Sequence, residues 1–240
     1  MPEKIGQIKL SIIVPIFNEE KSILILYNKI RETLKTFDVK SEIIFVDDGS
    51  TDSSCKVLRY LSKLRSDIRF FEFNLNKGQH KAIEKGFHEA QGEVVVTIDG
   101  DLQEEPRDIS KLIAKLDEGF DVVCGWRSVR KDSWLKVLKS KIGNYLHRKI
   151  TKLELHDMSC TMRAYRKSLV KNLILQEKYE VGFIPYILSK YTKRITEVKI
   201  KHHKRAFGKS KYGLLATTIG TIRCFIKLIL GNAKNRIVAW

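Results

Sequence analysis

The densest cluster of carboxylates in the chain follows directly after an apolar run, in "VVVTIDGDLQEEP" at residues 94–106. Asp99 and Asp101 flank Gly100, and on an extended backbone two residues at this spacing point to the same side. Gly100 lacks a Cβ and lets another group approach the backbone. Carboxylate oxygens suit Mg²⁺ or Mn²⁺, which proteins commonly bind together with substrate phosphates. The pattern predicts a Mg²⁺ or Mn²⁺ site that holds a diphosphate and stabilises charge on a leaving phosphate.

Two further polar motifs also follow apolar runs. Asn18 and Glu19 follow "LSIIVPIF" at 10–17, and "DDGS" at 47–50 follows another such run. One acidic turn of this kind is better explained as a solvated turn or a helix cap. Three of them at the ends of consecutive apolar runs favour a binding site instead.

The apolar runs alternate with segments of helical spacing, such as 19–37 and 78–92. This alternation predicts an α/β fold of Rossmann type, in which helices cover both faces of a mostly parallel sheet. Ligands bind at the carboxyl ends of the strands in such sheets. We therefore expect the three polar motifs to meet at one edge.

The charge is divided unequally along the chain. Residues 1–125 contain 18 Lys and Arg against 22 Asp and Glu, a net charge of −4, whereas residues 126–240 contain 27 against 6, a net charge of +21. A concentrated basic surface predicts an anionic partner, which could be nucleic acid, a phosphorylated substrate or membrane headgroups. A merely solvated basic face is the alternative. A nucleic-acid binding protein would leave the acidic motifs unexplained, so we expect no nucleic-acid partner.

The four cysteines are scattered and form no CxxC pair, which favours reduced thiols in a cytosolic setting. The polar first ten residues are not typical of a signal peptide. No GxGxxG follows the first apolar run, which argues against an NAD-dependent oxidoreductase.

The carboxyl-terminal half is expected to contain a basic amphipathic helix at 132–152, a helix at 180–191, an edge strand at 195–203 and a basic loop at 204–213. The apolar stretch 214–230 offers 17 positions. A spanning helix needs about 20 apolar residues.

Two cations interrupt that stretch, Arg223 and Lys227, and their spacing places them on one face of a helix. Another face gathers apolar side chains: Leu215, Ile219, Ile222, Ile226 and Ile229. This pattern predicts a helix in the interface of an anionic membrane. We expect a peripheral protein on the cytoplasmic face of the cell membrane. Packing of the helix on the sheet, a longer chain, a membrane-spanning partner or a homo-oligomer are alternatives.

The order of several motifs resembles that of family 2 glycosyltransferases of the GT-A fold. The motifs are "VPIFNEE" (14–20), "VDDGSTDSS" (46–54), "NKGQHKAIEKGF" (76–87), "IDGDLQEEP" (98–106), "GWR" (125–127), "SCTMRAYRK" (159–167) and "FGKSKY" (207–212). The resemblance is greatest to the polyprenyl-phosphate branch, which includes dolichyl-phosphate mannosyltransferase and undecaprenyl-phosphate sugar transferases. It implies a catalytic domain over 1–212, with a nucleotide-binding half at 1–125 and an acceptor-side half at 126–212. The amphipathic pattern described above predicts that a membrane-interface segment follows at 213–240.

The resemblance also implies roles for individual residues. On the nucleotide side these are Pro15, Phe17 and Glu19 in the pocket, Val46 and Asp48 at the base, and Asp47 in support of that turn. Asp99 and Asp101 would bind metal and diphosphate, with Gln103 near the metal and Gly100 where relatives often have Ala. Phosphates of donor or acceptor would meet Arg127, Arg205 and Lys211, while Arg163 would face the acceptor phosphate and Asp157 would orient the acceptor.

The activity that the resemblance implies is inverting transfer of a hexose from a nucleotide-diphosphate sugar to a polyprenyl phosphate. The attacking phosphate oxygen is already anionic near neutral pH, so no strong general base is required. The alternative is a family 2 enzyme that acts on a hydroxyl acceptor of a cell-surface polysaccharide and needs such a base.

Overall fold

The computed structural model describes residues 9–129, 143–145, 147–208 and 214–230. Its seven-stranded sheet has the order β3-β2-β1-β4-β6-β5-β7. The strands are β1 (Leu10–Ile16), β2 (Ser41–Asp47), β3 (Ile68–Glu72), β4 (Val94–Thr97), β5 (Val122–Trp126), β6 (Arg163–Arg166) and β7 (Ile195–Lys199). Strand β6 runs antiparallel to β4 and β5, and the other neighbouring pairs are parallel. The expected mostly parallel α/β sheet is confirmed.

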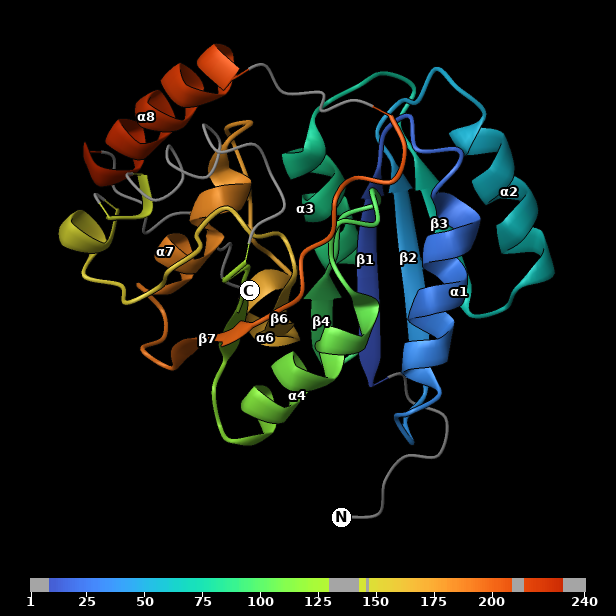
Figure 1. Ribbon diagram of the computed structural model, residues 1–240, viewed down its shortest axis with the longest axis horizontal. Coiled ribbons are helices and arrows are strands. Elements are labelled where there is room, and N and C mark those ends of the chain that lie inside the picture. The colour runs from blue at the N-terminus through green and yellow to red at the C-terminus, as the bar shows by residue number, and fades with distance from the viewer. Residues whose placement is uncertain (1–8, 130–142, 146, 209–213, 231–240) are drawn as a thin grey trace.

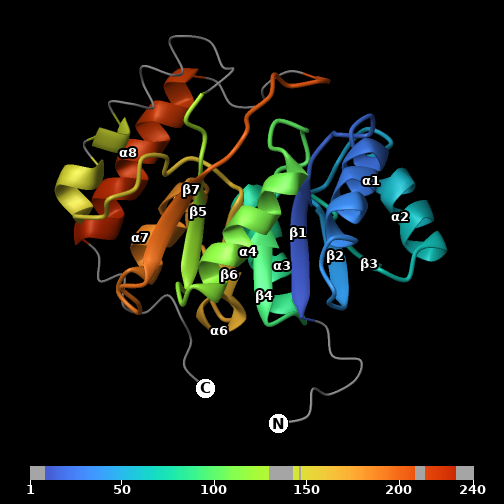
Figure 2. The ribbon, with the colours of Figure 1, turned by 60° about the horizontal axis from the view of Figure 1, so that its bottom comes forward.

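Helices cover both faces of this sheet (Figure 1), and Figure 2 shows α4 and α3 on opposite sides of it. One face carries α1 (Ile23–Leu34), α2 (Ser54–Leu64), and α4 (Ile109–Asp117) with the preceding turn η1 (Pro106–Asp108). The other carries α3 (Gln79–Glu89), α6 (Lys167–Val170), η2 (Glu180–Phe183), α7 (Ile184–Leu188) and α8 (Leu214–Leu230). The two layers explain why β1 is apolar at successive positions: Ile12 and Val14 enter one core, and Ile13 enters the other.

The strands end at turns of unusual backbone conformation. Asn18 and Leu102 have φ values of 54° and 62°, a region that non-glycine residues rarely adopt. The side chain of Asn18 supports its own turn, because its Oδ1 accepts the Thr51 N–H at 2.7 Å. Gly49 has a φ of 69°, and a Cβ there would lie 2.5 Å from the Leu75 carbonyl carbon. Such conformations persist where surrounding contacts hold them and are common at functional sites.

Helix α8 is attached to the rest of the molecule by Cys224 and Leu228, both buried in the second core. The expected amphipathic helix at 132–152 falls largely outside the described residues, although 143–145 and 147–151 are helical. His147 from that segment is buried and stacks on Phe183 and Phe225, with centroid separations of 5.7 and 5.2 Å. This aromatic stack joins the segment, η2 and α8.

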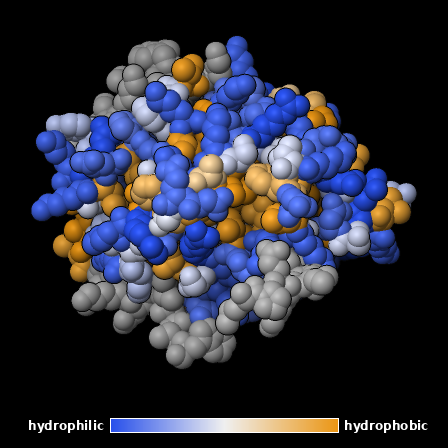
Figure 3. Space-filling view, turned by 90° about the horizontal axis from the view of Figure 1, so that it is seen from below, coloured by the Kyte–Doolittle hydropathy of each residue, from blue (hydrophilic) through white to orange (hydrophobic). Residues whose placement is uncertain are grey.

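Helix α8 also has an exposed apolar stripe. The stripe consists of Ile219, Ile222, Ile226 and Ile229. Arg223 and Lys227 are exposed as well, while the side chain of Leu215 lies outside the described part. Within the described ranges, the model contains no helix with the length and apolar character needed to cross a bilayer. The face at the amino ends of the strands, seen from below in Figure 3, is mostly hydrophilic with scattered apolar patches.

Candidate functional site

Hydrogen bonds bring the three acidic motifs together at the carboxyl edge of the sheet. The Asp48 N–H donates to the Ile16 carbonyl at 2.7 Å, which joins the second motif to the first. The Ser22 hydroxyl donates to the Gly100 carbonyl at 2.7 Å, which joins the helix after the first motif to the third. Gly100 is tightly enclosed, because a Cβ there would lie 2.6 Å from Ile16 Cδ1. An alanine at Gly100 would therefore require the tip of the Ile16 side chain to move, since the Pro15 carbonyl oxygen lies further away, at 3.2 Å.

The amino end of α3 contacts two of these motifs. The Asp48 carboxylate accepts the backbone N–H groups of Lys77 and Gly78 at 2.7 and 2.9 Å. The side-chain amide of Gln79 donates to Asp99 Oδ1 at 2.7 Å. Asp48 thus holds the loop before α3, and α3 in turn orients Asp99.

Asp101 in the acidic turn is buried and Asp99 is half-buried, in surroundings where charge is unfavourable. Burial raises the pKa of Asp99 well above its usual range, and the charges of Glu104 and Asp101 raise it further. Burial also raises the pKa of Asp101, although Arg205 opposes the shift. A bound cation would stabilise the charged form of these carboxylates, which their surroundings otherwise disfavour.

The donor set fits Mg²⁺ or Mn²⁺, since Asp99 and Asp101 supply hard oxygen ligands. Among the described residues, no group of three or more His, Cys, Asp or Glu side chains is placed to hold a metal ion. An ion bound by Asp99 and Asp101 would therefore need phosphate or water oxygens as further ligands, which is the usual situation for Mg²⁺.

A basic segment after β7 lies against the acidic turn. We call residues 201–205 the strap; in Figure 1 they pass in front of the carboxyl ends of β4 and β1. The Lys201 N–H donates to Asp108 at 2.6 Å, and the His203 N–H donates to the Gln103 carbonyl at 2.8 Å. A backbone bridge also pairs Glu104 with His202. The expected edge strand at 195–203 therefore ends at Lys199, and the rest forms the strap.

Arg205 lies at the end of the strap and contacts two motifs at once. Its Nη1 is 2.9 Å from Glu19 Oε1, and its Nη2 is 2.7 Å from Asp101 Oδ2. Gln103, expected near the metal, donates instead from Nε2 to the His203 carbonyl at 3.3 Å. Lys211 lies outside the described residues.

Glu104 is a site residue that the sequence reasoning missed. It is buried, and it accepts the backbone N–H groups of Asp99 and Met162 at 3.2 and 3.0 Å. The Cys160 thiol also donates to it at 3.2 Å. Glu104 thus ties the acidic turn to the segment before β6. Its neighbour Glu105 is the same type of residue and is less buried, so nothing in the sequence distinguished the two.

Arg127 and Asp157, both expected at the acceptor side, bind each other. Arg127 Nε and Nη2 lie 2.7 and 2.9 Å from the two oxygens of Asp157. Arg127 Nη2 also donates to the Ser159 hydroxyl at 2.7 Å. The pair is mostly buried. It therefore fixes the turn at 157–159 beside the strand end at Arg127.

Arg163 does not face the site in this structure. Its side chain lies in the interior, with 1% of the residue exposed. The guanidinium donates to the backbone carbonyls of Val181 and Met158 at 2.5 and 2.6 Å. We therefore correct the expectation of an acceptor-phosphate contact: Arg163 sits on an inner strand and holds the segment around η2 in place.

The remaining nucleotide-side residues lie at the ends of β1 and β2. Pro15 on β1 and Val46 on β2 lie opposite each other in the register of the two strands, and both are buried. Phe17, just beyond β1, is half-buried. Asp47 accepts the Ser50 N–H at 3.1 Å and its hydroxyl at 2.5 Å, which agrees with the expected support of the turn.

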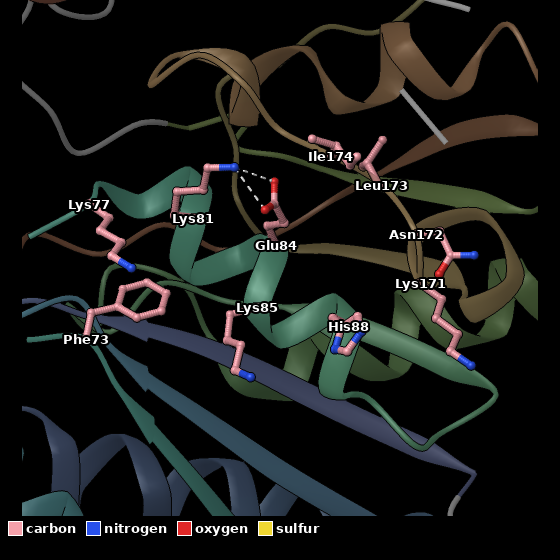
Figure 4. A pocket seen from close by; sticks show the side chains of 10 residues that line it. All are labelled: Phe73, Lys77, Lys81, Glu84, Lys85, His88, Lys171, Asn172, Leu173 and Ile174. Carbon is pink, nitrogen blue, oxygen red and sulfur yellow. Dashed lines mark hydrogen bonds and ion pairs between the residues drawn. The ribbon is translucent and has the colours of Figure 1, made fainter. Parts of the chain in front are cut away.

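A separate cavity of about 460 Å³ lies on the outer face of α3 (Figure 4). Lys81 on its wall binds Glu84 at 2.9 Å, and Lys77 lies over the Phe73 ring at 4.8 Å. Lys85, also on the wall, binds Glu89 at 2.7 Å. None of the residues assigned above lines this cavity, so we place the chemistry at the acidic edge instead.

Known proteins resemble the chain in sequence and in fold. Residues 11–174 match the model of the family described as Glycosyl transferase family 2. Over 214 residues, 89% of the chain, the sequence is 37% identical to undecaprenyl-phosphate 4-deoxy-4-formamido-L-arabinose transferase of Proteus mirabilis. The chain spans 65% of the length of that relative.

Among solved structures, glucosyl-3-phosphoglycerate synthase of Mycobacterium tuberculosis shares the fold. Its complex with Mn²⁺, uridine diphosphate and phosphoglyceric acid has a TM-score of 0.67 and 20% identity, over 95% of this chain and 79% of that one. Its complex with Mg²⁺ and uridine diphosphate has a TM-score of 0.70 and 20% identity, over 92% of this chain and 79% of that one. At this identity the likeness concerns the fold, and it confirms the expected GT-A type.

Proposed function

The chain belongs to glycosyl transferase family 2, and we propose that it is a metal-dependent, inverting glycosyltransferase. The donor is a nucleotide-diphosphate hexose and the acceptor is a polyprenyl phosphate. The observation that carries this proposal is the pair Asp99 and Asp101 at the carboxyl edge of the sheet, in a chain 37% identical to an undecaprenyl-phosphate sugar transferase.

The donor side follows from the acidic edge. A bound Mg²⁺ or Mn²⁺ would neutralise charge on the leaving diphosphate. Asp99 and Asp101 would hold the ion, and Gln79 keeps Asp99 oriented. Arg205 is placed to bind a diphosphate oxygen because its fork of N–H donors matches phosphate geometry.

The acceptor side needs cations more than it needs a base. The nucleophile is an oxygen of the polyprenyl phosphate, which carries negative charge near neutral pH, so no residue has to remove a proton. Asp157 is occupied by Arg127 in a bidentate pair, which suits a positioning role better than that of a base. The excess of Lys and Arg after residue 125 favours the approach of an anionic lipid headgroup.

Helix α8 supports a membrane location for the acceptor. Its exposed stripe of isoleucines lies next to Arg223 and Lys227, and Lys227 binds Glu177 at 2.5 Å. Apolar side chains bordered by cations are typical of helices that lie in the interface of an anionic membrane. We place the protein peripherally at the cytoplasmic face. A membrane-spanning partner or a second copy of the chain would cover the same stripe.

The test is transfer of radiolabelled sugar to purified undecaprenyl phosphate with Mn²⁺, from a panel of UDP-, GDP- and dTDP-sugars. We expect a labelled product that partitions into organic solvent and is absent with undecaprenol, which lacks the phosphate. Transfer to undecaprenol or to a polysaccharide, with none to undecaprenyl phosphate, would establish the hydroxyl-acceptor alternative.

A further inference from the structure

Arg205 has an unusual place for a residue that would bind phosphate. Its guanidinium bridges Glu19, which follows β1, and Asp101, which follows β4. Glu19 and Asp101 are each 8% exposed, and the Arg205 side chain is 21% exposed. The three charges therefore form a largely desolvated group at the point where the donor would bind. Removing the cation would leave two carboxylates close together in a poorly solvated place without the positive charge that they share.

The contact is built so that the side chain can leave without disturbing the rest of the strap. Backbone hydrogen bonds fix the strap at Lys201 and at His203. Arg205 lies two residues further on, and Gly208 follows with a φ of 69°. Rotation of the Arg205 side chain would release Glu19 and Asp101 from the guanidinium while the strap stays on the acidic turn.

We propose that Arg205 is the counterion of the empty donor site and that it couples metal binding to diphosphate binding. A divalent ion that arrives alone competes with the guanidinium for Asp101 and leaves Arg205 with one of its two carboxylate partners, Glu19. A diphosphate that arrives with the ion offers the guanidinium a new partner. Metal and nucleotide diphosphate therefore bind with positive cooperativity, and each raises the affinity for the other by the same factor. The inference rests on the proposed donor site.

The experiment measures Mn²⁺ affinity by electron paramagnetic resonance, with and without UDP or GDP. In the natural chain, the nucleotide should strengthen Mn²⁺ binding by about 10-fold or more, within the usual range of coupling between sites. Arg205→Gln should bind Mn²⁺ alone several-fold more tightly, because no cation competes, and should lose most of the strengthening by nucleotide. Opposite changes in the two measurements distinguish this role from simple loss of a phosphate contact.

Two further variants complete the design. Arg205→Lys keeps the charge but replaces the fork with a single ammonium, so its Mn²⁺ affinity should lie between the other two. Lys204→Ala removes a charge from the neighbouring exposed residue, and it should behave like the natural chain. Thermal melting of each variant shows whether the fold is kept, and if Arg205→Gln fails to fold, Arg205→Lys carries the comparison.

The outcomes separate the inference from the function on which it rests. Equal Mn²⁺ affinity and equal strengthening by nucleotide in the natural chain and in the folded Arg205 variants would overturn the coupling role. A natural chain that binds neither UDP nor GDP at any Mn²⁺ concentration would overturn the proposed donor site and the inference with it. Identical changes in Lys204→Ala and Arg205→Gln would show a general charge effect and would also overturn the specific role of Arg205.

Discussion

The side-chain amide of Gln79 lies 2.7 Å from Asp99 Oδ1, so the first residue of α3 orients a carboxylate at the end of β4. Asp99 is held from its other side as well, because its backbone N–H donates to Glu104 at 3.2 Å. A carboxylate with two fixed neighbours is preorganised for a cation, and preorganised charge is the main source of electrostatic catalysis.

The first prediction is that Gln79→Ala weakens Mn²⁺ binding and slows transfer by roughly 10-fold, the effect of losing one hydrogen bond to a charged group. Isothermal titration with Mn²⁺ and initial rates of sugar transfer measure the two effects. Gln91→Ala is the matched control, because it removes an exposed glutamine side chain and keeps the backbone bonds at that residue. Unchanged Mn²⁺ affinity in Gln79→Ala would show that the contact does not support the ion.

The second prediction concerns the requirement for metal. Asp101→Asn keeps the size of the side chain and removes its charge, so we expect transfer to fall by at least about 10²-fold, the scale of losing a major electrostatic stabiliser. EDTA should abolish transfer by the natural chain, and Mn²⁺ or Mg²⁺ should restore it. Asp117→Asn, at an exposed position on α4, is the control. Full activity in EDTA would contradict metal dependence.

Much of the fold was predictable because its signal is local. The apolar runs around Ile12 and Phe45 read directly as strands buried on both faces, and the turn residues after them mark one edge of a parallel sheet. The direction of β6 was not predictable in the same way. An antiparallel strand between β4 and β5 depends on how the chain returns to the sheet over many residues, and such pairing has no local signal.

Candidate site residues that belong to a sequence motif could be predicted, whereas pairings between residues that are distant in the sequence could not. Asp99 and Asp101 could be identified by their spacing together with their position after an apolar run. The sequence could not show that Arg205 pairs with Glu19, 186 residues away, because that contact exists only once the strap lies on the acidic turn. The expected role of Arg163 was wrong for the same reason. Its place in a motif suggested a phosphate ligand, but its hydrogen-bond partners are backbone carbonyls in the interior.

The third prediction tests the structural role of Arg163. Arg163→Lys cannot reach the carbonyls of both Val181 and Met158 in the same way, so it should lower the free energy of unfolding by about 2–3 kcal/mol. Urea denaturation measures the loss. The KM for undecaprenyl phosphate should stay close to that of the natural chain at a temperature where the variant is folded. A large rise in that KM without loss of stability would restore the original phosphate-binding interpretation.

The fourth prediction concerns acid stability. Burial, together with the charge of Arg163, lowers the pKa of His147 to about 4. In the unfolded chain the pKa is about 6.5, so between these two pH values the unfolded chain binds a proton at His147 and the folded chain does not. The stability that depends on neutral His147 is therefore present above pH 6.5 and is lost as the pH falls from about 6.5 towards 4. Because a difference of one pKa unit corresponds to about 1.36 kcal/mol, the free energy of unfolding should fall by up to about 3 kcal/mol.

His147→Phe keeps a ring against Phe183 and Phe225 and removes the titrating group. Urea denaturation of both chains at several pH values between 4 and 7 isolates the histidine, because the carboxylates are common to both. We expect the natural chain to lose more stability than the variant as the pH falls. Parallel pH profiles would contradict the role of His147.

The last prediction tests the membrane surface. Ile222 and Ile226 on α8 are 54% and 50% exposed, and Arg223 and Lys227 lie beside them. Replacing both isoleucines with serine removes apolar area that would enter the bilayer, and each buried aliphatic side chain contributes about 1.5–3 kcal/mol. We therefore expect flotation with liposomes that contain anionic lipid to weaken by 10-fold or more at fixed salt.

The controls distinguish membrane binding from general effects. Leu24→Ser changes a side chain of similar exposure, 51%, on α1, and it should float like the natural chain. High salt should release the natural chain, because screening weakens the attraction of Arg223 and Lys227 to the headgroups. If the double variant floats as well as the natural chain, the stripe does not bind lipid. If it instead changes the oligomeric state measured by ultracentrifugation, a second copy of the chain covers α8.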